Sequence, residues 1–159
     1  EATGESIDDV WLAESATVHE SAVLRAPVVV GPDAVVGPGA VIGPHTTLGR
    51  NATVGSNAVV QTSVLDEDTR VDPGASLIDC VTGQGVRLGA GTTVPGGTAD
   101  VTVAGTVHED QRLGAVVADR ARLGGGVSVE PGTLVGPGAE VHAGCHVRGA
   151  IEEDAEVMR

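Results

Sequence analysis

The sequence predicts an all-β solenoid in which short strands wind around a triangular prism. Three observations support this class: branched aliphatic residues recur every six positions, glycine occurs 24 times in 159 residues, and phenylalanine and tyrosine are absent. An α-helix turns every 3.6 residues and cannot keep a six-residue period on one face, whereas a short strand followed by a tight corner can. Without these aromatic residues, the interior must be filled by small and branched aliphatic side chains.

The six-residue series defines the expected interior. It runs unbroken from Leu12 to Val60, then slips by one residue before Leu65 and again before Thr82. A small or β-branched residue follows four positions after each early aliphatic, and glycine often follows it directly. We expect the aliphatic to fill the interior, the small residue to fit the corner, and glycine to supply unusual backbone angles. The interior positions are Leu12, Val18, Leu24, Val30, Val36, Ile42, Leu48, Val54, Val60, Leu65, Val71, Leu77, Thr82, Leu88, Val94, Val117, Leu123, Val129, Val135, Val141 and Val147.

Three six-residue sides give coils of about 18 residues, which predicts about seven coils stacked roughly 4.8 Å apart. We expect these coils over residues 12–94 and 117–151. Residues 95–116 break the period and contain alternating valines, so we expect a loop or hairpin that projects from the prism and serves function or assembly. Residues 1–11 are expected to form a linker or N-terminal tail, and residues 152–159 a C-terminal tail.

The chain is strongly acidic, with 22 Asp and Glu against nine basic residues and a formal net charge of −13. All the basic residues are arginine. This charge repels polyanions, so neither nucleic acid nor an anionic membrane surface is an expected partner. Acidic proteins without lysine are typical of concentrated salt, which screens self-repulsion; biased codon usage in an ordinary acidic protein is the alternative. The chain carries no recognisable signal peptide or apolar span, so we expect a cytoplasmic location.

No metal site is expected in this domain. Cys80 and Cys145 are far apart in the sequence and fit a reduced compartment. His142 and His146 fall on opposite sides of a predicted corner, which is an awkward arrangement for binding one metal ion.

The residue before each interior aliphatic should point outward, and one side of the prism is apolar at these positions. Val23, Val41 and Val59 recur once per predicted coil and should stack in successive coils. A row of exposed valines on so charged a protein suggests a subunit interface. The alternative is the ordinary preference of valine for an exposed strand.

Longer strings resemble a known family. VLRAPVVVGPDAVVGPGAVIGPHTTLG (residues 23–49), VVQTSVLDEDTRVDPGASL (59–77) and VRLGAGTTV (86–94) resemble the C-terminal half of sugar-1-phosphate nucleotidyltransferases, and residues 111–147 continue the match. The likeness is greatest to archaeal bifunctional proteins that are both sugar-1-phosphate nucleotidyltransferases and amino-sugar-1-phosphate acetyltransferases. It implies a left-handed parallel β-helix of hexapeptide repeats, a homotrimer with parallel prisms, and an N-terminal nucleotidyltransferase domain that this chain does not contain.

The family's acetyltransferase uses a histidine to deprotonate the amino group of a sugar phosphate, which then attacks the thioester of acetyl-CoA. By the resemblance, that histidine position holds Pro73, which has no titratable group. The family's tyrosine falls at Ser76, and its phosphate-binding arginine, its lysine and its asparagine fall at Gly43, Gln61 and Gly96. We therefore expect the acetyl-acceptor site to be degraded while the scaffold is kept.

Two histidines remain as candidate bases: His45, near the aligned arginine position, and His108, in the projecting loop. The alternative for each is a surface histidine without a catalytic role. Acetyl-CoA is the cofactor that the resemblance implies, and its candidate binding residues are Arg112, Arg122, Gly124 and Arg148. The alternative is that these arginines, with Arg120, balance nearby acids.

Two functions therefore stay open. The first is a trimerising β-helix module of nucleotide-sugar metabolism, attached to a nucleotidyltransferase. The second is an active acyl-CoA-dependent N- or O-acetyltransferase that acts on a sugar phosphate.

Overall fold

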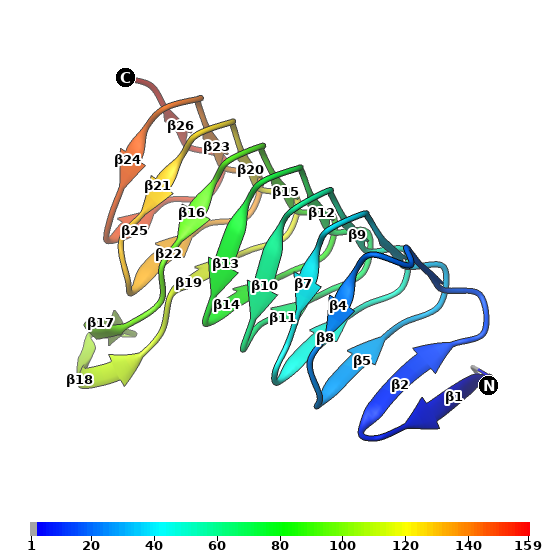
Figure 1. Ribbon diagram of the computed structural model, residues 1–159. Coiled ribbons are helices and arrows are strands. Elements are labelled where there is room, and N and C mark those ends of the chain that lie inside the picture. The colour runs from blue at the N-terminus through cyan, green and yellow to red at the C-terminus, as the bar shows by residue number, and fades with distance from the viewer. Residues whose placement is uncertain (1–2) are drawn as a thin grey trace.

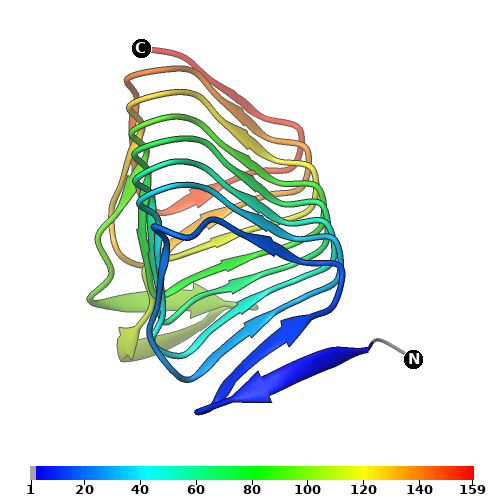
Figure 2. The same cartoon turned by 45° about the vertical axis from the view of Figure 1, so that its right-hand side comes forward.

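The computed structural model describes residues 3–159 and is built from β-strands, with no helix in that range. Three parallel sheets form the sides of a triangular prism, and the two ends of the chain lie at opposite ends of it (Figures 1 and 2). The predicted left-handed parallel β-helix is confirmed. None of the described residues forms a helix with the length and apolar character of a membrane span.

Each coil passes through the three faces in the order A, B, C. Face A contains β1 (Gly4–Ile7), β2 (Val10–Ala13), β5 (Val28–Val30), β8 (Thr46–Leu48), β11 (Val64–Leu65), β14 (Cys80–Thr82), β19 (Ala115–Val117), β22 (Thr133–Val135) and β25 (Ala150–Ile151). Face B contains β3 (Thr17–Val18), β6 (Val35–Val36), β9 (Thr53–Val54), β12 (Arg70–Val71), β15 (Arg87–Leu88), β20 (Arg122–Leu123), β23 (Glu140–Val141) and β26 (Glu156–Val157). Face C contains β4 (Val23–Leu24), β7 (Val41–Ile42), β10 (Val59–Gln61), β13 (Ser76–Ile78), β16 (Thr93–Val94), β21 (Ser128–Val129) and β24 (His146–Val147).

The interior follows the six-residue series. From Val30 to Val147 every position of the series is buried, including Thr82, which is 3% exposed. Leu12, Val18 and Leu24 are partly buried because they belong to the first coil, which has a neighbouring coil on one side alone. The backbone pairs from coil to coil, as where the His19 amide donates to the Val36 carbonyl at 2.9 Å. The inside–outside assignment made from the sequence is therefore confirmed.

Coil length changes along the prism. The length of a coil is the sequence separation of two residues that pair in successive coils. It is three six-residue repeats, here called hexads, where Val41 pairs with Val59, and one residue less where Val59 pairs with Ser76. The two predicted slips fall at Thr62 and Asp79, whose φ angles of 48° and 54° turn the backbone in a shortened corner. The last coil is shorter still, because the pairing of Glu140 with Glu156 leaves it two positions short of three hexads.

The described prism reaches further than residues 12–151. β1 runs antiparallel to β2 within the segment expected to be a linker, and β2 already begins at Val10. At the other end, β25 and β26 extend the stack to Val157. The step from Val147 to Ile151 is two residues short of six, so the series is displaced there, although Ile151 and Val157 resume the six-residue spacing. Faces A and B accordingly carry eight parallel strands and face C seven, against about seven coils expected.

The segment between β16 and β19 leaves the prism at the edge between faces C and A; it ends before Ala115, so the last two residues of the expected range 95–116 already belong to face A. The segment forms an antiparallel hairpin of β17 (Thr98–Val103) and β18 (Thr106–Arg112), which projects from the stack (Figures 1 and 2). Side chains from both strands hold the hairpin to the prism. Arg112 donates through Nε to Oδ2 of the buried Asp79 at 2.9 Å, and Val101, which is 7% exposed, lies beside Gly132.

Candidate functional site

The positions aligned with the family's acceptor site are spread around face C. Three of them lie at the edge where face C turns into face A: Gly43 follows β7, Gln61 ends β10, and Gly96 comes shortly after β16. Pro73 lies at the opposite edge, in the turn from β12 to β13, and Ser76 is half-buried on the face itself. Within this chain these five residues supply neither a titratable base nor a cation.

Two of these positions have a clear structural role. Gly43 has a φ of 97°, and a Cβ placed on it would collide with the Arg25 carbonyl oxygen. A Cβ on Gly55, in the preceding coil, would lie 2.9 Å from the Cδ of Pro73, so the proline ring stacks directly above that glycine. The neighbouring coil therefore leaves no space for a side chain at position 43, and the ring of Pro73 packs against the glycine of the coil before it.

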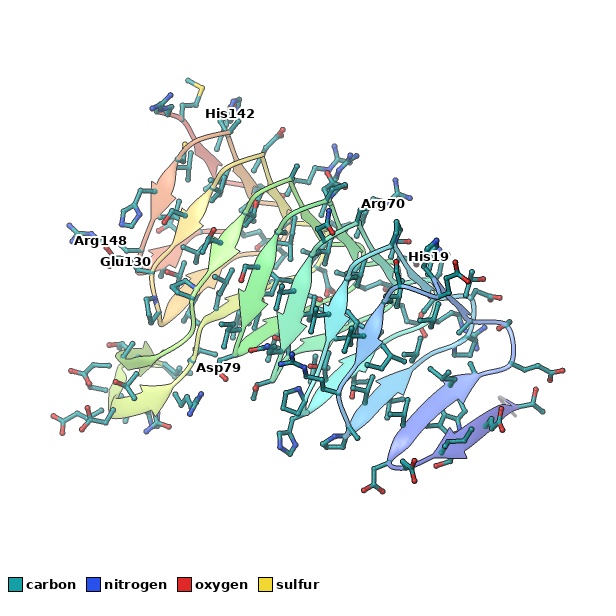
Figure 3. All side chains as sticks on the ribbon, viewed as in Figure 1. His19, Arg70, Asp79, Glu130, His142 and Arg148 are labelled. Atoms are coloured by element: carbon teal, nitrogen blue, oxygen red, sulfur yellow. The ribbon has the colours of Figure 1, made fainter. Side chains whose placement is uncertain are left out.

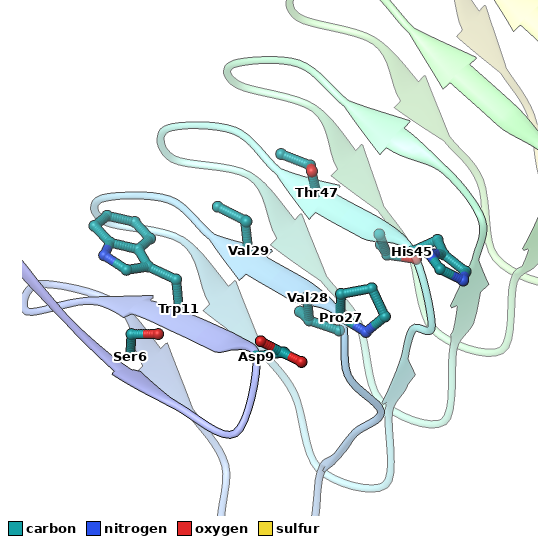
Figure 4. Close-up of a pocket in the computed structure, with 9 residues that line it drawn as sticks. Ser6, Asp9, Trp11, Pro27, Val28, Val29, His45 and Thr47 are labelled. Atoms are coloured by element: carbon teal, nitrogen blue, oxygen red, sulfur yellow. The ribbon is translucent and has the colours of Figure 1, made fainter.

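His45 lies in the turn before β8 with a φ of 54°, and its side chain is exposed. It lines an open pocket of about 360 Å³ together with Asp9, Trp11 and Pro27 (Figure 4). In the close-up, Pro27 lies between Asp9 and His45. Within residues 3–159 the structure records no hydrogen bond to the His45 ring, so no described carboxylate orients it as a base.

His108 lies on β18, opposite Val101, and is exposed. The two candidate bases are therefore on different elements, one on a turn of the prism and the other on the hairpin. Two further histidines do have carboxylate partners, which sequence reasoning missed. His142 contacts Glu156 at 2.7 Å and His146 contacts Glu130 at 2.7 Å.

These histidine–carboxylate pairs join neighbouring coils, so the partner of each histidine could have been sought about one coil away in the sequence. Their side chains are 43% to 60% exposed, and exposed ion pairs contribute little to stability. Across the described part of the chain, His, Cys, Asp and Glu side chains form no group of three or more placed to hold a metal ion.

The structure brings together two of the four candidate cofactor-binding residues. Arg122 and Gly124 line one groove on the side of face B, whereas Arg112 is ion-paired with Asp79 at the base of the hairpin. Arg148 follows β24 at the edge between faces C and A, on another side of the prism from Arg70 (Figure 3).

The groove that holds Arg122 also holds arginines that sequence reasoning missed. An open groove of about 530 Å³ is lined by Arg87, Arg122 and Gly124, and an adjoining one of about 210 Å³ by Arg70, Arg87 and Arg122. Arg70, Arg87 and Arg122, here called the arginine row, precede the interior residues Val71, Leu88 and Leu123. The sequence contains the signal for this row. The outward positions of face B could have been continued beyond Thr53 by allowing for the two slips, and they would have led to the three arginines.

The predicted valine row is present on face C. Val41 is the register partner of both Val23 and Val59, and Val23 is 46% exposed. Face A carries a longer outward apolar row that was not singled out from the sequence. Its members pair in sequence along the sheet and are Trp11, Val29, Thr47, Val64, Val81, Val116 and Leu134.

Cys80 is fully buried at the start of β14. Burial raises the pKa of its thiol to about 12, because desolvation disfavours the thiolate. The thiolate is the nucleophilic form, so Cys80 is excluded as a nucleophile near neutral pH.

A family model described as the GMPPB C-terminal domain matches residues 24–113. Comparison with curated proteins gives no match.

Similar solved structures include LpxA, a hexapeptide transferase family protein and PerB. LpxA, a UDP-N-acetylglucosamine acyltransferase from Bacteroides fragilis 9343, superposes with a TM-score of 0.71 at 16% identity, covering 86% of this chain and 55% of LpxA. A hexapeptide transferase family protein from Anaplasma phagocytophilum superposes with a TM-score of 0.55 at 18% identity, covering 86% and 74%. PerB from Caulobacter crescentus, in complex with CoA and GDP-perosamine, superposes with a TM-score of 0.47 at 24% identity, covering 87% of this chain and 51% of PerB. At these identities the first two likenesses establish the fold, and the chain spans 55% of the length of LpxA.

Proposed function

This chain belongs to the GMPPB C-terminal domain family, and from that premise we propose that it is the trimerising β-helix domain of a sugar-1-phosphate nucleotidyltransferase/acetyltransferase-type protein of nucleotide-sugar metabolism. Its acetyl-acceptor site is degraded. The nucleotidyltransferase domain of the proposed protein lies outside the 159 residues. The acidic charge of the chain supports a salt-adapted protein without a nucleic-acid or membrane partner. We also propose a cytoplasmic location, which fits the two unpaired cysteines.

The observation that carries the proposal is the chemistry at the aligned acceptor positions. An ammonium group must lose its proton before it attacks a thioester, and Pro73 cannot accept one. The phosphate of an acceptor needs cations, and Gly43 and Gln61 offer none. Because a side chain at 43 would collide with the Arg25 carbonyl oxygen, the local backbone also opposes a return of the arginine.

The trimer is supported by the valine row on face C. Val23, Val41 and Val59 form a continuous outward apolar row in a chain of net charge −13. Burying such a row between subunits removes apolar surface from water, which favours association. Trimers are also what the resemblance to hexapeptide transferases implies.

A second function is favoured by one observation, the pocket of about 360 Å³ beside His45. If a sugar phosphate bound there, the exposed imidazole of His45 could serve as the base of an acyl-CoA-dependent N- or O-acetyltransferase. His108 would be the other candidate, and Arg112, Arg122, Gly124 and Arg148 the residues available for acetyl-CoA. The absence of an orienting carboxylate at His45, among the residues described, favours the first proposal.

A thiol-release assay separates the two functions. The chain is incubated in molar salt with acetyl-CoA and glucosamine 1-phosphate, and free CoA is followed with a thiol reagent. We expect no acceptor-dependent release, because loss of a general base lowers rates by about 10²- to 10⁴-fold. Turnover faster than about 1 per second, in the range of ordinary enzymes, would overturn the proposal. His45→Gln and His108→Gln would then identify the base, with His19→Gln as the matched control.

A further inference from the structure

The arginine row places three positive side chains next to one another in a strongly acidic chain. Arg70, Arg87 and Arg122 lie on the adjacent strands β12, β15 and β20 and are direct register partners. Neighbouring strands are about 4.8 Å apart, so three guanidinium groups stand side by side on face B. These are three of the nine basic residues in the chain.

Like charges directly opposite each other destabilise a sheet. Alternation with acidic residues would remove that cost, and the chain has 22 of them. Instead, within the described residues, Arg87 has one ion pair, with Asp72 at 3.4 Å, whereas Arg70 and Arg122 have none. The sheet thus keeps an unfavourable arrangement that a bound anion would relieve.

Glycines line the groove beside the row. Gly89, Gly124 and Gly125 line the groove of about 530 Å³ beside Arg87 and Arg122. A Cβ on Gly89 would lie 2.5 Å from the carbonyl carbon of Gly124, and one on Gly124 would lie 2.6 Å from the amide nitrogen of Ala143. Close stacking of the coils therefore excludes side chains here, and a ligand held by the arginines can approach the main chain.

The other charged groups define the limits of the row. Asp68 and Asp72 line the grooves beside it, and Glu140, the register partner of Arg122, follows it on the next strand. His142 lines the same groove but is paired with Glu156. On the N-terminal side the row ends at the uncharged Thr53, the register partner of Arg70. The positive stretch is therefore short, which suits a small anion rather than a polymer.

We propose that Arg70, Arg87 and Arg122 bind the diphosphate group of a small-molecule ligand on face B. A planar guanidinium donates two parallel N–H bonds to phosphate oxygens, so three in a line match a ligand with several adjacent phosphoryl oxygens. The net charge of −13 opposes long polyanions, but direct contacts persist at physiological salt because distant charges are screened beyond about 8 Å. This binding does not depend on acetyl transfer.

Calorimetric titration of the full chain with inorganic pyrophosphate, in about 0.15 M salt, tests this site. We expect saturable binding that Arg122→Gln and Arg70→Gln each weaken about tenfold, through the loss of charge-assisted hydrogen bonds. Arg122→Lys should also weaken it, because lysine keeps the charge but loses the planar fork. The matched control Arg25→Gln removes the same charge from the edge between faces C and A, on another side of the prism, and should change the dissociation constant less than about twofold.

Competition identifies the source of the diphosphate. A nucleoside diphosphate, a nucleoside-diphosphate sugar and CoA should each displace pyrophosphate, and the tightest competitor is the natural class. Absence of saturable pyrophosphate binding would overturn the proposal, as would an equal loss of affinity in Arg25→Gln. A change in oligomer size for Arg122→Gln without any pyrophosphate binding would also overturn it, by assigning the row to a contact between protein chains.

Discussion

The first three coils and the later coils have the same interior, but their outward positions on face B differ. From Val10 to Gln61 every outward position on the three faces is uncharged, and most are valine or threonine. From Val64 onward the outward positions include the three arginines on face B, followed by Glu140 and Glu156. The coil length also changes, since the first coils keep three full hexads whereas the coil after Val59 and the last coil fall short of them.

This difference shows which positions the fold constrains. An interior position must pack without water in either region, because adjacent coils leave no space around it; every such position is aliphatic except Thr82, whose hydroxyl is hydrogen-bonded to that of Thr69. An outward position has no such requirement, so its residue type reflects what the surface contacts. The valine row on face C of the first coils suits an apolar interface between subunits, and the arginine row on face B of the later coils suits contact with an anion, whereas the outward row of face A stays largely apolar in both regions.

The strongest test compares two variants of the same strand, one with a carboxylate on its interior side and the other with a carboxylate on its outward side. Val36→Asp puts a carboxylate in the interior of β6, where Val36 is 1% exposed, and we expect a loss of at least about 3 kcal/mol in the free energy of unfolding. Val35→Asp, at a position that is 41% exposed, should change it by less than about 1 kcal/mol. Thermal unfolding in high salt measures both, and equal melting temperatures would contradict the inside–outside assignment.

The second test concerns the apolar exterior of the first coils. Val41→Glu should convert a trimer into monomers of about 15.8 kDa, because a buried carboxylate in an apolar interface lacks a partner. Light scattering after gel filtration measures the mass. Val64→Glu, on the apolar row of face A where Val64 is 48% exposed, is the matched control and should leave the trimer intact. Dissociation by Val64→Glu alone would move the interface to face A.

The third test concerns the hairpin, which divides the later coils. Asp79→Asn removes the charge opposite Arg112, and we expect faster hydrogen exchange of the amides of β17 and β18. The stability loss should be about 1 kcal/mol, since the Arg112 side chain is 72% exposed and its charge is largely screened. Asp33→Asn, which breaks the exposed contact to Arg50 at 3.9 Å, should leave hydrogen exchange in the hairpin unchanged.

The smallest expected effect concerns the interior near the second slip. Because burial raises the pKa of Cys80 from 9.0 to about 12, its thiol stays protonated at pH 8 and should not react with iodoacetamide in the folded chain. Unfolding should expose it to alkylation at the ordinary rate. A Cys145→Ala background leaves Cys80 as the single thiol, and mass spectrometry measures the modified fraction. Modification of the folded chain at the rate of a free thiol would show that the later coils open locally.

The sequence by itself determined the interior, the triangular coils and the positions of both slips. One aliphatic residue every six positions is a local pattern, and the backbone geometry of short strands and corners converts it directly into a prism. It also predicted the stacking of Val23, Val41 and Val59, because those coils keep a constant length of three hexads.

The tertiary structure decided which residues meet once that length varies. Arg70 pairs with Arg87 in the directly following coil, but Arg87 pairs with Arg122 across the whole hairpin, which is inserted between their coils. The shortened last coil likewise escapes a search for a period of six. Neighbours on the surface of a solenoid are set by the number of residues in each intervening coil, and that number is fixed by corner geometry and insertions rather than by the hydrophobic pattern.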